Sequence, residues 1–313
     1  MTSPFVSIVV PTRNGMATLP PLLDAVRSQN ASFPFEIVAV DSASTDGTAD
    51  LLRARADRVV SIAAEAFDHG LTRNLGIEHA RGTLIVLIVQ DALPLGGSWL
   101  ADLIAPLTRD DRIAGAFARQ QPRPDASAIT RHYHAQWVAA SGVDRTVAVD
   151  AAAFGTLQPM DRLLHCAFDN VCSCIRRSVW ERHPFRSTPI AEDLEWAREV
   201  LLAGHRLAYV PRAVVVHSHD RSARYELART YLLHRRLFEL FQLRTIPDVR
   251  SLARAVAASV GTHVRCLRGV PSNGERFAEM RRALALAIAW PLGQYVGGLS
   301  AVRGWQPFRS RTV

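Results

Sequence analysis

The chain contains 313 residues, 48% hydrophobic and 21% charged, an apolar content that supports a buried core and excludes an intrinsically disordered protein. Its four cysteines lack the Cys-x-x-Cys spacing of zinc sites and the density of disulfide-rich proteins, so we expect all of them to be reduced. The net charge of +8 comes from 37 basic residues, all of them arginine, and the excess lies near the C-terminus.

The first 90 residues alternate between short apolar strands and amphipathic helices, which predicts a parallel α/β sheet. The predicted strands are residues 5–10, 36–40, 59–62 and 83–89. The predicted helices are residues 19–26, 48–55 and 74–79. No Gly-x-Gly-x-x-Gly follows the first strand, so an ordinary dinucleotide-binding fold is not expected. Ligands of such sheets bind where the strands end, so functional side chains are expected at those positions.

The middle of the chain is less regular. Residues 98–140 have a mixed pattern, and Gln120 to Ser127, rich in proline and polar groups, predicts an exposed loop. Residues 191–203 predict a helix that ends at Gly204, followed by a strand and a short apolar run that leads into His217. We place a domain boundary near residue 220, with a catalytic domain expected over 1–220 and a basic, amphipathic helical region over 221–313.

The C-terminal region is strongly basic. Residues 1–220 hold 21 arginines against 24 acidic residues, whereas residues 221–313 hold 16 arginines against 5 acidic residues. Such a charge fits either nucleic acid or an anionic membrane surface, because both present dense phosphate. The leucines between its arginines favour a peripheral membrane contact, and the proposed anchors are Leu232, Leu233, Leu237 and Leu240.

Residues 283–302 form an uncharged run long enough to be considered as a membrane span. Pro291 and several glycines interrupt this run, and much of the remainder is alanine, which contributes little to membrane insertion. We therefore expect a buried or interfacial pair of helices here.

Acidic and histidine side chains follow the predicted strands or begin the predicted helices. Asp41 ends the second strand and can accept hydrogen bonds from a ribose or a base, whereas Asp46 is equally well explained as the cap of the next helix. Asp91 follows the strand over 83–89 and suits a hard divalent cation such as Mg²⁺ or Mn²⁺. Asp193 begins a helix, where a carboxylate held in a fixed direction can serve as a general base.

His217 and His219 lie two residues apart after the last predicted strand, so both project to one side of the chain. Neutral imidazole suits Mn²⁺ better than Mg²⁺, and either histidine could join Asp91 in a metal site.

Together these segments resemble glycosyltransferase family 2, and within it the bacterial rhamnosyltransferases. The resemblance covers roughly residues 5–220. Its motifs are Val10-Pro11-Thr12-Arg13-Asn14-Gly15, Asp41-Ser42-x-Ser44-x-Asp46-Gly47-Thr48, Phe67-Asp68-His69-Gly70, Thr72-Arg73-Asn74-x-Gly76, Gln90-Asp91-Ala92, Glu192-Asp193-x-Glu195-Trp196 and the segment from Pro211 to His217. The first Asp of the Asp-x-Asp motif found in the family is Val89 here, so one link to ribose or metal is missing.

The resemblance implies an α/β, GT-A-type, Rossmann-like mixed sheet flanked by helices, with a C-terminal helical extension. It also implies roles for individual residues, with Asp193 as the catalytic base and Asp91 and His217 as ligands of Mn²⁺ or Mg²⁺. The residues implied in nucleotide-sugar binding are Pro11, Thr12, Arg13, Asn14, Asp41, Ser42, Asp68, His69, Arg73, Asn74 and Gln90.

These features predict an inverting glycosyltransferase that moves a sugar to a saccharide or lipid-linked glycan acceptor in cell-surface polysaccharide synthesis. The Phe67-Asp68-His69-Gly70 segment resembles a rhamnosyltransferase signature and implies dTDP-L-rhamnose as the donor. The alternatives are another nucleotide-hexose donor and a non-catalytic nucleotide-sugar-binding module. A sugar nucleotidyltransferase would need a Gly- and Lys-rich loop, and the chain has no lysine. Without a recognisable signal peptide, we expect a cytoplasmic protein at the inner face of the membrane.

Overall fold

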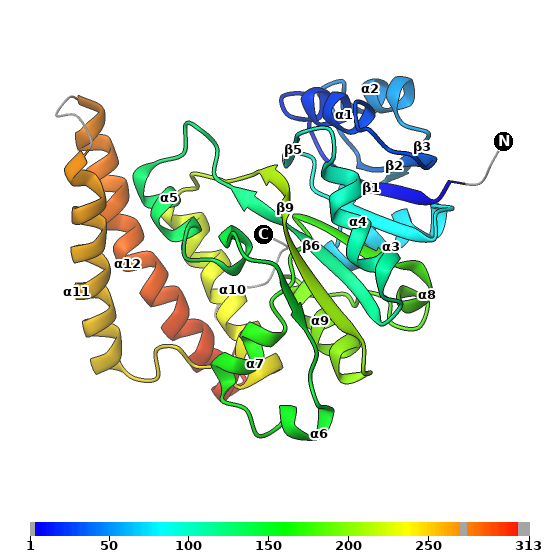
Figure 1. Cartoon of the computed structure of the whole chain (residues 1–313). Helices are drawn as coiled ribbons and strands as arrows, with labels where there is room; N and C mark the ends of the chain where they lie inside the picture. The colour runs from blue at the N-terminus through cyan, green and yellow to red at the C-terminus, as the bar shows by residue number, and fades with distance from the viewer. Residues whose placement is uncertain (1–3, 270–273, 306–313) are drawn as a thin grey trace.

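The computed structural model describes residues 4–269 and 274–305, and within them one mixed sheet forms the centre of the molecule (Figure 1). The strand order is β3-β2-β1-β4-β8-β6-β9-β5, and β7 pairs with β9 on the side of this path. The strands are β1 (Val6–Thr12), β2 (Phe35–Ser42), β3 (Arg58–Ile62), β4 (Leu84–Ile88), β5 (Leu93–Leu95), β6 (Ile113–Gln121), β7 (Arg145–Val147), β8 (Cys172–Arg176) and β9 (Arg206–Val216). Helices flank the sheet, which confirms the predicted fold class.

The N-terminal half of the sheet is parallel, as predicted. Strand β1 lies between β2 and β4, and β3 pairs with the outer edge of β2. In this register Thr12 is the partner of Asp41, so the last residues of β1 and β2 lie side by side. The parallel pairing therefore brings two of the predicted nucleotide-binding residues to one edge of the sheet.

The other half of the sheet is mixed. Strand β8 is antiparallel to both β4 and β6, whereas β6 and β9 are parallel. Residues 206–216 form one continuous strand, and its pairing with β6 shifts register after Ala118. This arrangement places the end of β6, the start of β8 and the end of β9 close to the end of β4.

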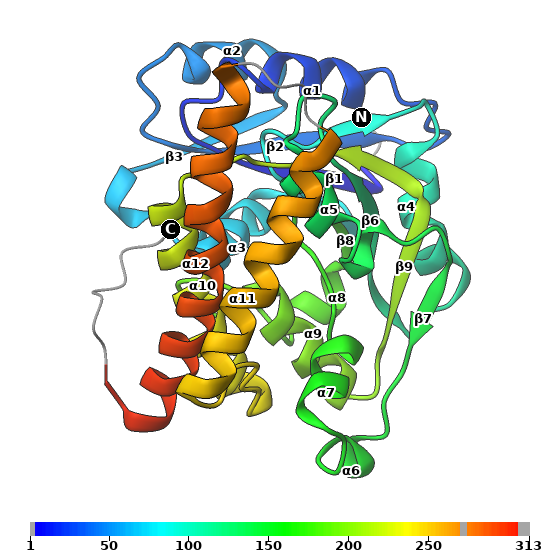
Figure 2. The ribbon, with the colours of Figure 1, turned by 90° about the vertical axis from the view of Figure 1, so that its left-hand side faces the viewer.

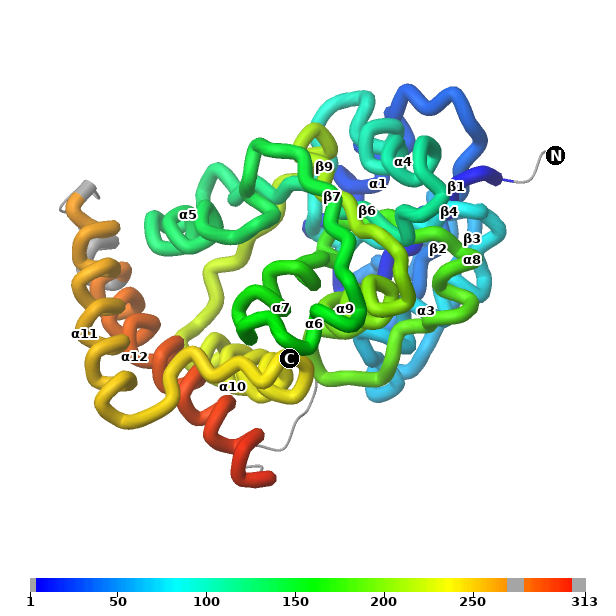
Figure 3. The backbone as a smooth tube through the Cα atoms, turned by 60° about the horizontal axis from the view of Figure 1, so that its bottom comes forward, coloured from blue at the N-terminus to red at the C-terminus, as the bar shows by residue number. Residues whose placement is uncertain are grey.

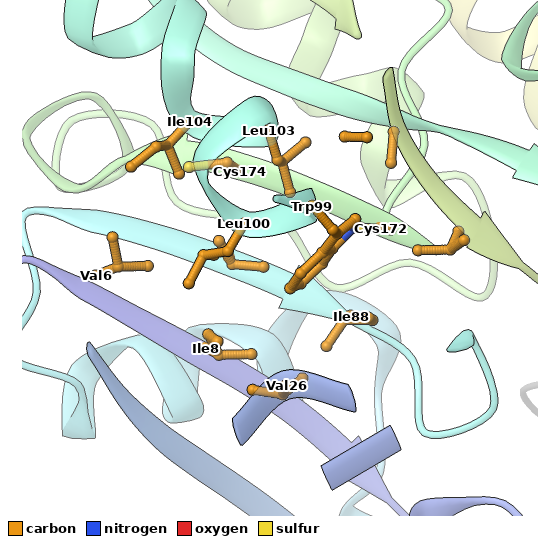
Figure 4. Packing of buried hydrophobic residues seen from close by; sticks show 14 of the residues in the cluster. Val6, Ile8, Val26, Ile88, Trp99, Leu100, Leu103, Ile104, Cys172 and Cys174 are labelled. Atoms are coloured by element: carbon orange, nitrogen blue, oxygen red, sulfur yellow. The ribbon is translucent and has the colours of Figure 1, made fainter. Parts of the chain in front are cut away.

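Two hydrophobic cores fill the two faces of the sheet. The flanking helices are α1 (Leu19–Arg27), α2 (Thr48–Arg55), α3 (His69–His79), α4 (Trp99–Arg109), α5 (Ala128–His134), α6 (Ala151–Phe154), α7 (Pro159–His165), α8 (Arg177–Trp180) and α9 (Glu192–Leu202). Helices α1 and α4 cover one face, where Trp99 packs among aliphatic side chains (Figure 4). Helices α3 and α9 contribute Ile77 and Trp196 to the core on the opposite face.

All four cysteines are free thiols. Cys172 and Cys174 project from β8 into the core beneath α4, as their spacing predicts (Figure 4). Burial raises the pKa of both thiols far above the ordinary value, and it raises the pKa of Cys166 to about 12. These three side chains therefore remain protonated and act as packing groups.

Three helices follow the sheet: α10 (Ala223–Phe241), α11 (Val249–Cys266) and α12 (Gly274–Arg303). The predicted boundary near residue 220 does not separate two cores, because Leu237 and Phe241 of α10 belong to the same core as α9. Arg236 also forms an ion pair of 2.6 Å with Glu195 of α9. Helix α10 thus belongs to the same packed unit as the sheet.

The proposed membrane anchors on α10 are wrong for the same reason. Leu232 and Leu237 are buried, and Leu233 and Leu240 pack against the core shared with α9. An amphipathic pattern shows that a helix has an apolar face, but it does not show whether protein or lipid covers that face.

The uncharged run over 283–302 lies within one helix, α12, and not in the expected pair (Figure 2). Pro291 is accommodated inside this helix. Among the described residues, Glu279–Arg303 is a helical stretch long and apolar enough to cross a membrane, yet in its 18-residue window with a mean hydropathy of 1.2, 44% is buried inside the protein.

Candidate functional site

The ends of β1 and β2 form a tightly bonded corner of the site. Asp41 is only 3% exposed, and its carboxylate accepts hydrogen bonds from the Thr12 hydroxyl at 3.2 Å and the Ser44 hydroxyl at 2.5 Å. Pro11 is half-buried in β1, and Ser42 is fully buried with no hydrogen-bond partner for its hydroxyl among the described residues. The structure therefore brings Thr12 and Asp41 together, as the sequence predicts.

The loop after β1 is attached to the end of β4 through one side chain. Gln90 accepts a hydrogen bond from the backbone N–H of Arg13 at 2.9 Å and donates one to its carbonyl at 3.0 Å. A Cβ on Gly15 would lie 2.7 Å from the Gln90 side chain, so glycine permits this close approach. Gln90 thus positions the loop next to Asp91.

The same loop is also held by the turn after β2. Asn14 donates its backbone N–H to the Ser44 hydroxyl at 2.8 Å and accepts from the Thr45 N–H at 2.9 Å. Asp46 accepts from the backbone N–H and hydroxyl of Thr48, and this bonding lowers the pKa of Asp46. Of the two interpretations of Asp46, the structure favours the structural one at the start of α2.

Asp68 has structural partners at the start of α3. One carboxylate oxygen accepts hydrogen bonds from the N–H groups of Gly70 and Leu71, both at 2.8 Å, and the other accepts from the Ser187 hydroxyl at 2.8 Å. His69 packs edge-to-face against Phe67. Asp68 therefore caps the helix and attaches it to the loop before α9.

Asn74 is directed away from the open site. Its amide donates to the carbonyl of Phe185 at 2.7 Å and accepts from the Trp180 indole at 2.8 Å and the Phe185 N–H at 3.1 Å. These partners give the amide a structural role in a buried environment, and its predicted contact with the nucleotide stays a prediction. The residue is a structural support for α3.

Arg73 projects from α3 toward the start of α9. Its guanidinium lies 3.1 Å from the carboxylate of Glu192, and both side chains are less than a tenth exposed, at 6% and 7%. Removing one partner of such a buried pair would leave an uncompensated charge. The Nε group of Arg73 is buried and has no hydrogen-bond partner among the described residues.

Asp193 lies at the N-terminal end of α9. Ala191, with a φ of 64°, turns the chain just before this helix. The Asp193 carboxylate accepts hydrogen bonds from its neighbour Leu194 at 2.8 Å and from the backbone N–H of Asn170 at 3.3 Å. Burial raises the pKa of Asp193 well above its usual range, and the charges of Glu192 and Asp169 raise it further. A carboxylate with a raised pKa is a suitable general base.

Two functional candidates were missed in the sequence, Asp169 and Gln120. Asp169 accepts a hydrogen bond of 2.6 Å from Gln120 and one of 3.4 Å from the Trp137 indole, and burial raises its pKa. Gln120 is 6% exposed and lies in β6, so the prediction of an exposed loop starting at this residue is wrong. The sequence signal that could have identified Gln120 is a polar residue at the end of an apolar strand, where a buried polar group is unusual.

Asp91, His217 and His219 form the candidate metal centre. Nε2 of His219 lies 3.2 Å from one Asp91 oxygen, and Nε2 of His217 lies 3.7 Å from the other. One ligand atom from each of the three residues lies within 4.8 Å of the others. Opposite ligands around a cation that binds at about 2.1 Å lie about 4.2 Å apart, so small side-chain rotations would fit one ion.

The protonation states of the histidines agree with metal binding. Burial lowers the pKa of His217 to about 4, although the nearby Asp91 charge opposes this effect, and burial also lowers the pKa of His219. Both imidazoles are therefore neutral near pH 7 and keep a lone pair for a cation. Nδ1 of His217 lies 3.4 Å from the Gln120 oxygen, which connects the metal centre to Asp169.

The described contacts form one continuous site. They run from Asp41 and Thr12 through Arg13, Gln90 and Asp91 to the histidines, and then through Gln120 and Asp169 toward Asp193. One end offers hydrogen-bonding groups, the middle offers oxygen and nitrogen ligands, and the other end offers the half-buried carboxylate of Asp193. Such a site can hold an anionic ligand with a cation and remove a proton from a second molecule.

Comparisons with known proteins agree with this geometry. The model of the family described as Glycosyl transferase family 2 matches residues 7–179. An O-antigen chain rhamnosyltransferase of Salmonella typhimurium is 28% identical over 236 residues, which cover 72% of this chain and 70% of that protein.

Two solved structures share the fold. A mannosyltransferase of Pyrobaculum calidifontis in complex with GDP-Man and Mn²⁺ has a TM-score of 0.55 and 20% identity, and the match covers 98% of this chain and 77% of that chain. Glucosyl-3-phosphoglycerate synthase of Mycobacterium tuberculosis in complex with Mn²⁺, UDP-glucose and phosphoglyceric acid has a TM-score of 0.52 and 17% identity, over 79% and 81% of the two chains. They confirm the GT-A-type architecture.

Proposed function

The chain belongs to glycosyltransferase family 2, and from this premise we propose that it transfers L-rhamnose from dTDP-L-rhamnose, with inversion, to a saccharide or lipid-linked glycan in cell-surface polysaccharide synthesis. The observation that carries the proposal is the position of Asp193, a carboxylate with a raised pKa in the same site as the candidate metal centre. The two features supply the functions of a cation-dependent inverting transfer, a base for the acceptor and a cation site for the diphosphate.

In the proposed reaction Asp193 accepts the proton of the acceptor hydroxyl as this oxygen attacks the anomeric carbon of the donor. The bond from that carbon to the diphosphate breaks in the same displacement, so no covalent sugar intermediate forms on the protein. Asp91, His217 and His219 would hold Mn²⁺ or Mg²⁺. Such a cation, when bound, neutralises negative charge on a leaving diphosphate.

The remaining residues of the site bind and orient. We assign Asp41 and Thr12 to the nucleotide, and Arg13 and Gln90 to the loop that closes over it. We assign Arg73, whose guanidinium lies 3.1 Å from Glu192 at the start of α9, to the sugar-nucleotide donor. His69 is proposed to contact the sugar, because Asp68 fixes the turn that carries it.

The donor assignment predicts a ranking. Among dTDP-rhamnose, UDP-glucose, UDP-galactose and GDP-mannose, we expect dTDP-rhamnose to be turned over about tenfold or more faster than the others, because a site shaped for one sugar loses hydrogen bonds to another. The support is the 28% identity to an O-antigen chain rhamnosyltransferase and the Phe67-Asp68-His69-Gly70 segment. Initial rates of nucleoside diphosphate release measure it. Faster turnover of a UDP-hexose would show that rhamnose is not the preferred sugar, although the protein would still be a glycosyltransferase.

The environment of Asp193 predicts a pH dependence. Its raised pKa means that turnover should fall as the pH drops through that value, at a higher pH than an ordinary aspartate would require. Asp169→Asn removes a nearby negative charge, which lowers the pKa of Asp193, so the acidic limb of the pH profile should move to lower pH. Profiles of kcat for the two proteins test this. An unchanged limb would show that Asp193 does not control it.

We place the reaction at the inner face of the membrane, where a lipid-linked acceptor would be available. The excess of arginine over acidic residues in 221–313 supports this placement.

A further inference from the structure

Helix α12 has an apolar stripe that the rest of the described protein does not cover. Leu284, Ile288 and Val302 on this stripe are 40%, 51% and 49% exposed. Three half-buried side chains continue the same line, and at helical spacing the six residues share one side. The stripe consists of Leu284, Ile288, Leu292, Tyr295, Leu299 and Val302. It extends over about 27 Å at the usual rise of an α-helix.

The opposite side of α12 is fixed against α10. A Cβ on Gly297 would lie 2.4 Å from the Tyr231 carbonyl, and one on Gly293 would lie 3.0 Å from the Leu227 carbonyl. Gln294 accepts a hydrogen bond from Thr245 at 3.0 Å. These contacts determine which side of the helix faces the protein, so the stripe faces outward. They also keep α12 alongside the domain, which is incompatible with a simple membrane span.

The surroundings of the stripe are basic. Exposed Arg281 and Arg303 lie at its two ends, and neither forms an ion pair with an acidic side chain among the described residues. Helix α11 lies beside α12 on the outside of the molecule (Figures 2 and 3). Within α11, Arg250, Arg254 and Arg265 are exposed on one face, and the helix contains no acidic residue.

This combination distinguishes between two occupants of the stripe. A second copy of the chain would place Arg281 against Arg281 or Arg303, depending on the direction of pairing, and would bring two basic α11 regions near each other. An anionic bilayer instead pairs the arginines with phosphate and covers the apolar side chains with acyl chains. Tyr295 and the half-exposed Trp305 are side-chain types that favour the bilayer interface.

We infer that α12 is the membrane-docking element, lying flat on an anionic lipid surface with the stripe inserted at the level of the headgroups. The inference rests on the proposed function in one respect, which is that the acceptor of the transfer lies at a membrane. Arg281 and Arg303 at the two ends of the stripe supply the attraction, and the stripe supplies the apolar contact. Docking through α12 would hold the candidate site at a fixed distance from lipid-linked acceptors.

The test is vesicle flotation of the full chain. A chain truncated at residue 220 would lack α10, and the core that α10 covers would be exposed. We expect binding to phosphatidylglycerol vesicles to exceed binding to phosphatidylcholine vesicles by about tenfold or more, and high salt to weaken it. Ile288→Asp should weaken binding by about tenfold or more. Val143→Asp, at a 73% exposed site in a distant loop, introduces the same charge and should leave binding unchanged.

Absence of binding by the full chain, or equal binding by Ile288→Asp, would overturn the inference. Sedimentation of both proteins tests the other occupant, since a dimer that Ile288→Asp dissociates would assign the stripe to a second copy. Turnover of a water-soluble acceptor without vesicles should be the same in all three proteins, because Ile288 lies outside the candidate site. A chain that binds the vesicles but shows no turnover would contradict the proposed reaction and leave the membrane docking of α12 supported.

Discussion

Asp193→Asn is expected to leave donor binding intact and to lower turnover by about 10² to 10⁴-fold. The amide has nearly the same shape as the carboxylate, and its single oxygen can still accept the 2.8 Å hydrogen bond from Leu194, so α9 should begin as before. It cannot take a proton from the acceptor hydroxyl. The loss should therefore appear in kcat, with a small change in donor affinity. Calorimetry with donor and Mn²⁺ measures binding, and release of dTDP measures turnover.

Asp161→Asn is a suitable control, because Asp161 is an exposed residue in the short helix α7, outside the described site contacts. Its turnover should match that of the unmodified chain. Turnover of Asp193→Asn within about threefold of normal would exclude Asp193 as the base. Asp169, a half-buried carboxyl group whose charge acts on Asp193, would then be the next residue to replace.

Asp91→Asn should lower both Mn²⁺ affinity and turnover by about 100-fold or more, since even residues that support metal ligands typically contribute 10- to 100-fold. Asp91 is the acidic member of the candidate centre, and the two neutral histidines cannot balance the charge of a divalent cation. Electron paramagnetic resonance of free Mn²⁺ measures the affinity without any turnover. Unchanged Mn²⁺ affinity in Asp91→Asn would show that the cation binds elsewhere or is not required.

The two histidines can be separated in the same assay. His217→Gln and His219→Gln should each weaken Mn²⁺ binding, because both Nε2 atoms lie near the Asp91 carboxylate. A loss with only one of them would identify the single imidazole ligand.

The local fold could be predicted where periodicity is strong. Helix α2 begins and ends at Thr48 and Arg55, as the sequence indicates, and the four N-terminal strands lie where apolar runs occur. The single helix α12 could not be distinguished from a helix pair, because Pro291 usually interrupts a helix in isolation. Here the packing of Gly293 and Gly297 against α10 stabilises a continuous helix.

The site was predictable at the ends of parallel strands and unpredictable where distant segments meet. Asp41 and Asp91 follow strands directly, so their position at the sheet edge follows from topology. Asp169 precedes an antiparallel strand, and its bond to Gln120 depends on the pairing of β8 with β6. Motif similarity also cannot distinguish a ligand contact from a structural support, and Asn74 is of the second kind.

The most direct test of the account is dTDP release from dTDP-L-rhamnose by the full chain, measured with a lipid-linked glycan acceptor in the presence and absence of Mn²⁺. We predict release over many turnovers that requires both acceptor and cation and is lost in Asp193→Asn. A chain that binds the donor at one site without consuming it, under all of these conditions, would contradict cation-dependent rhamnosyl transfer and indicate a nucleotide-sugar-binding module.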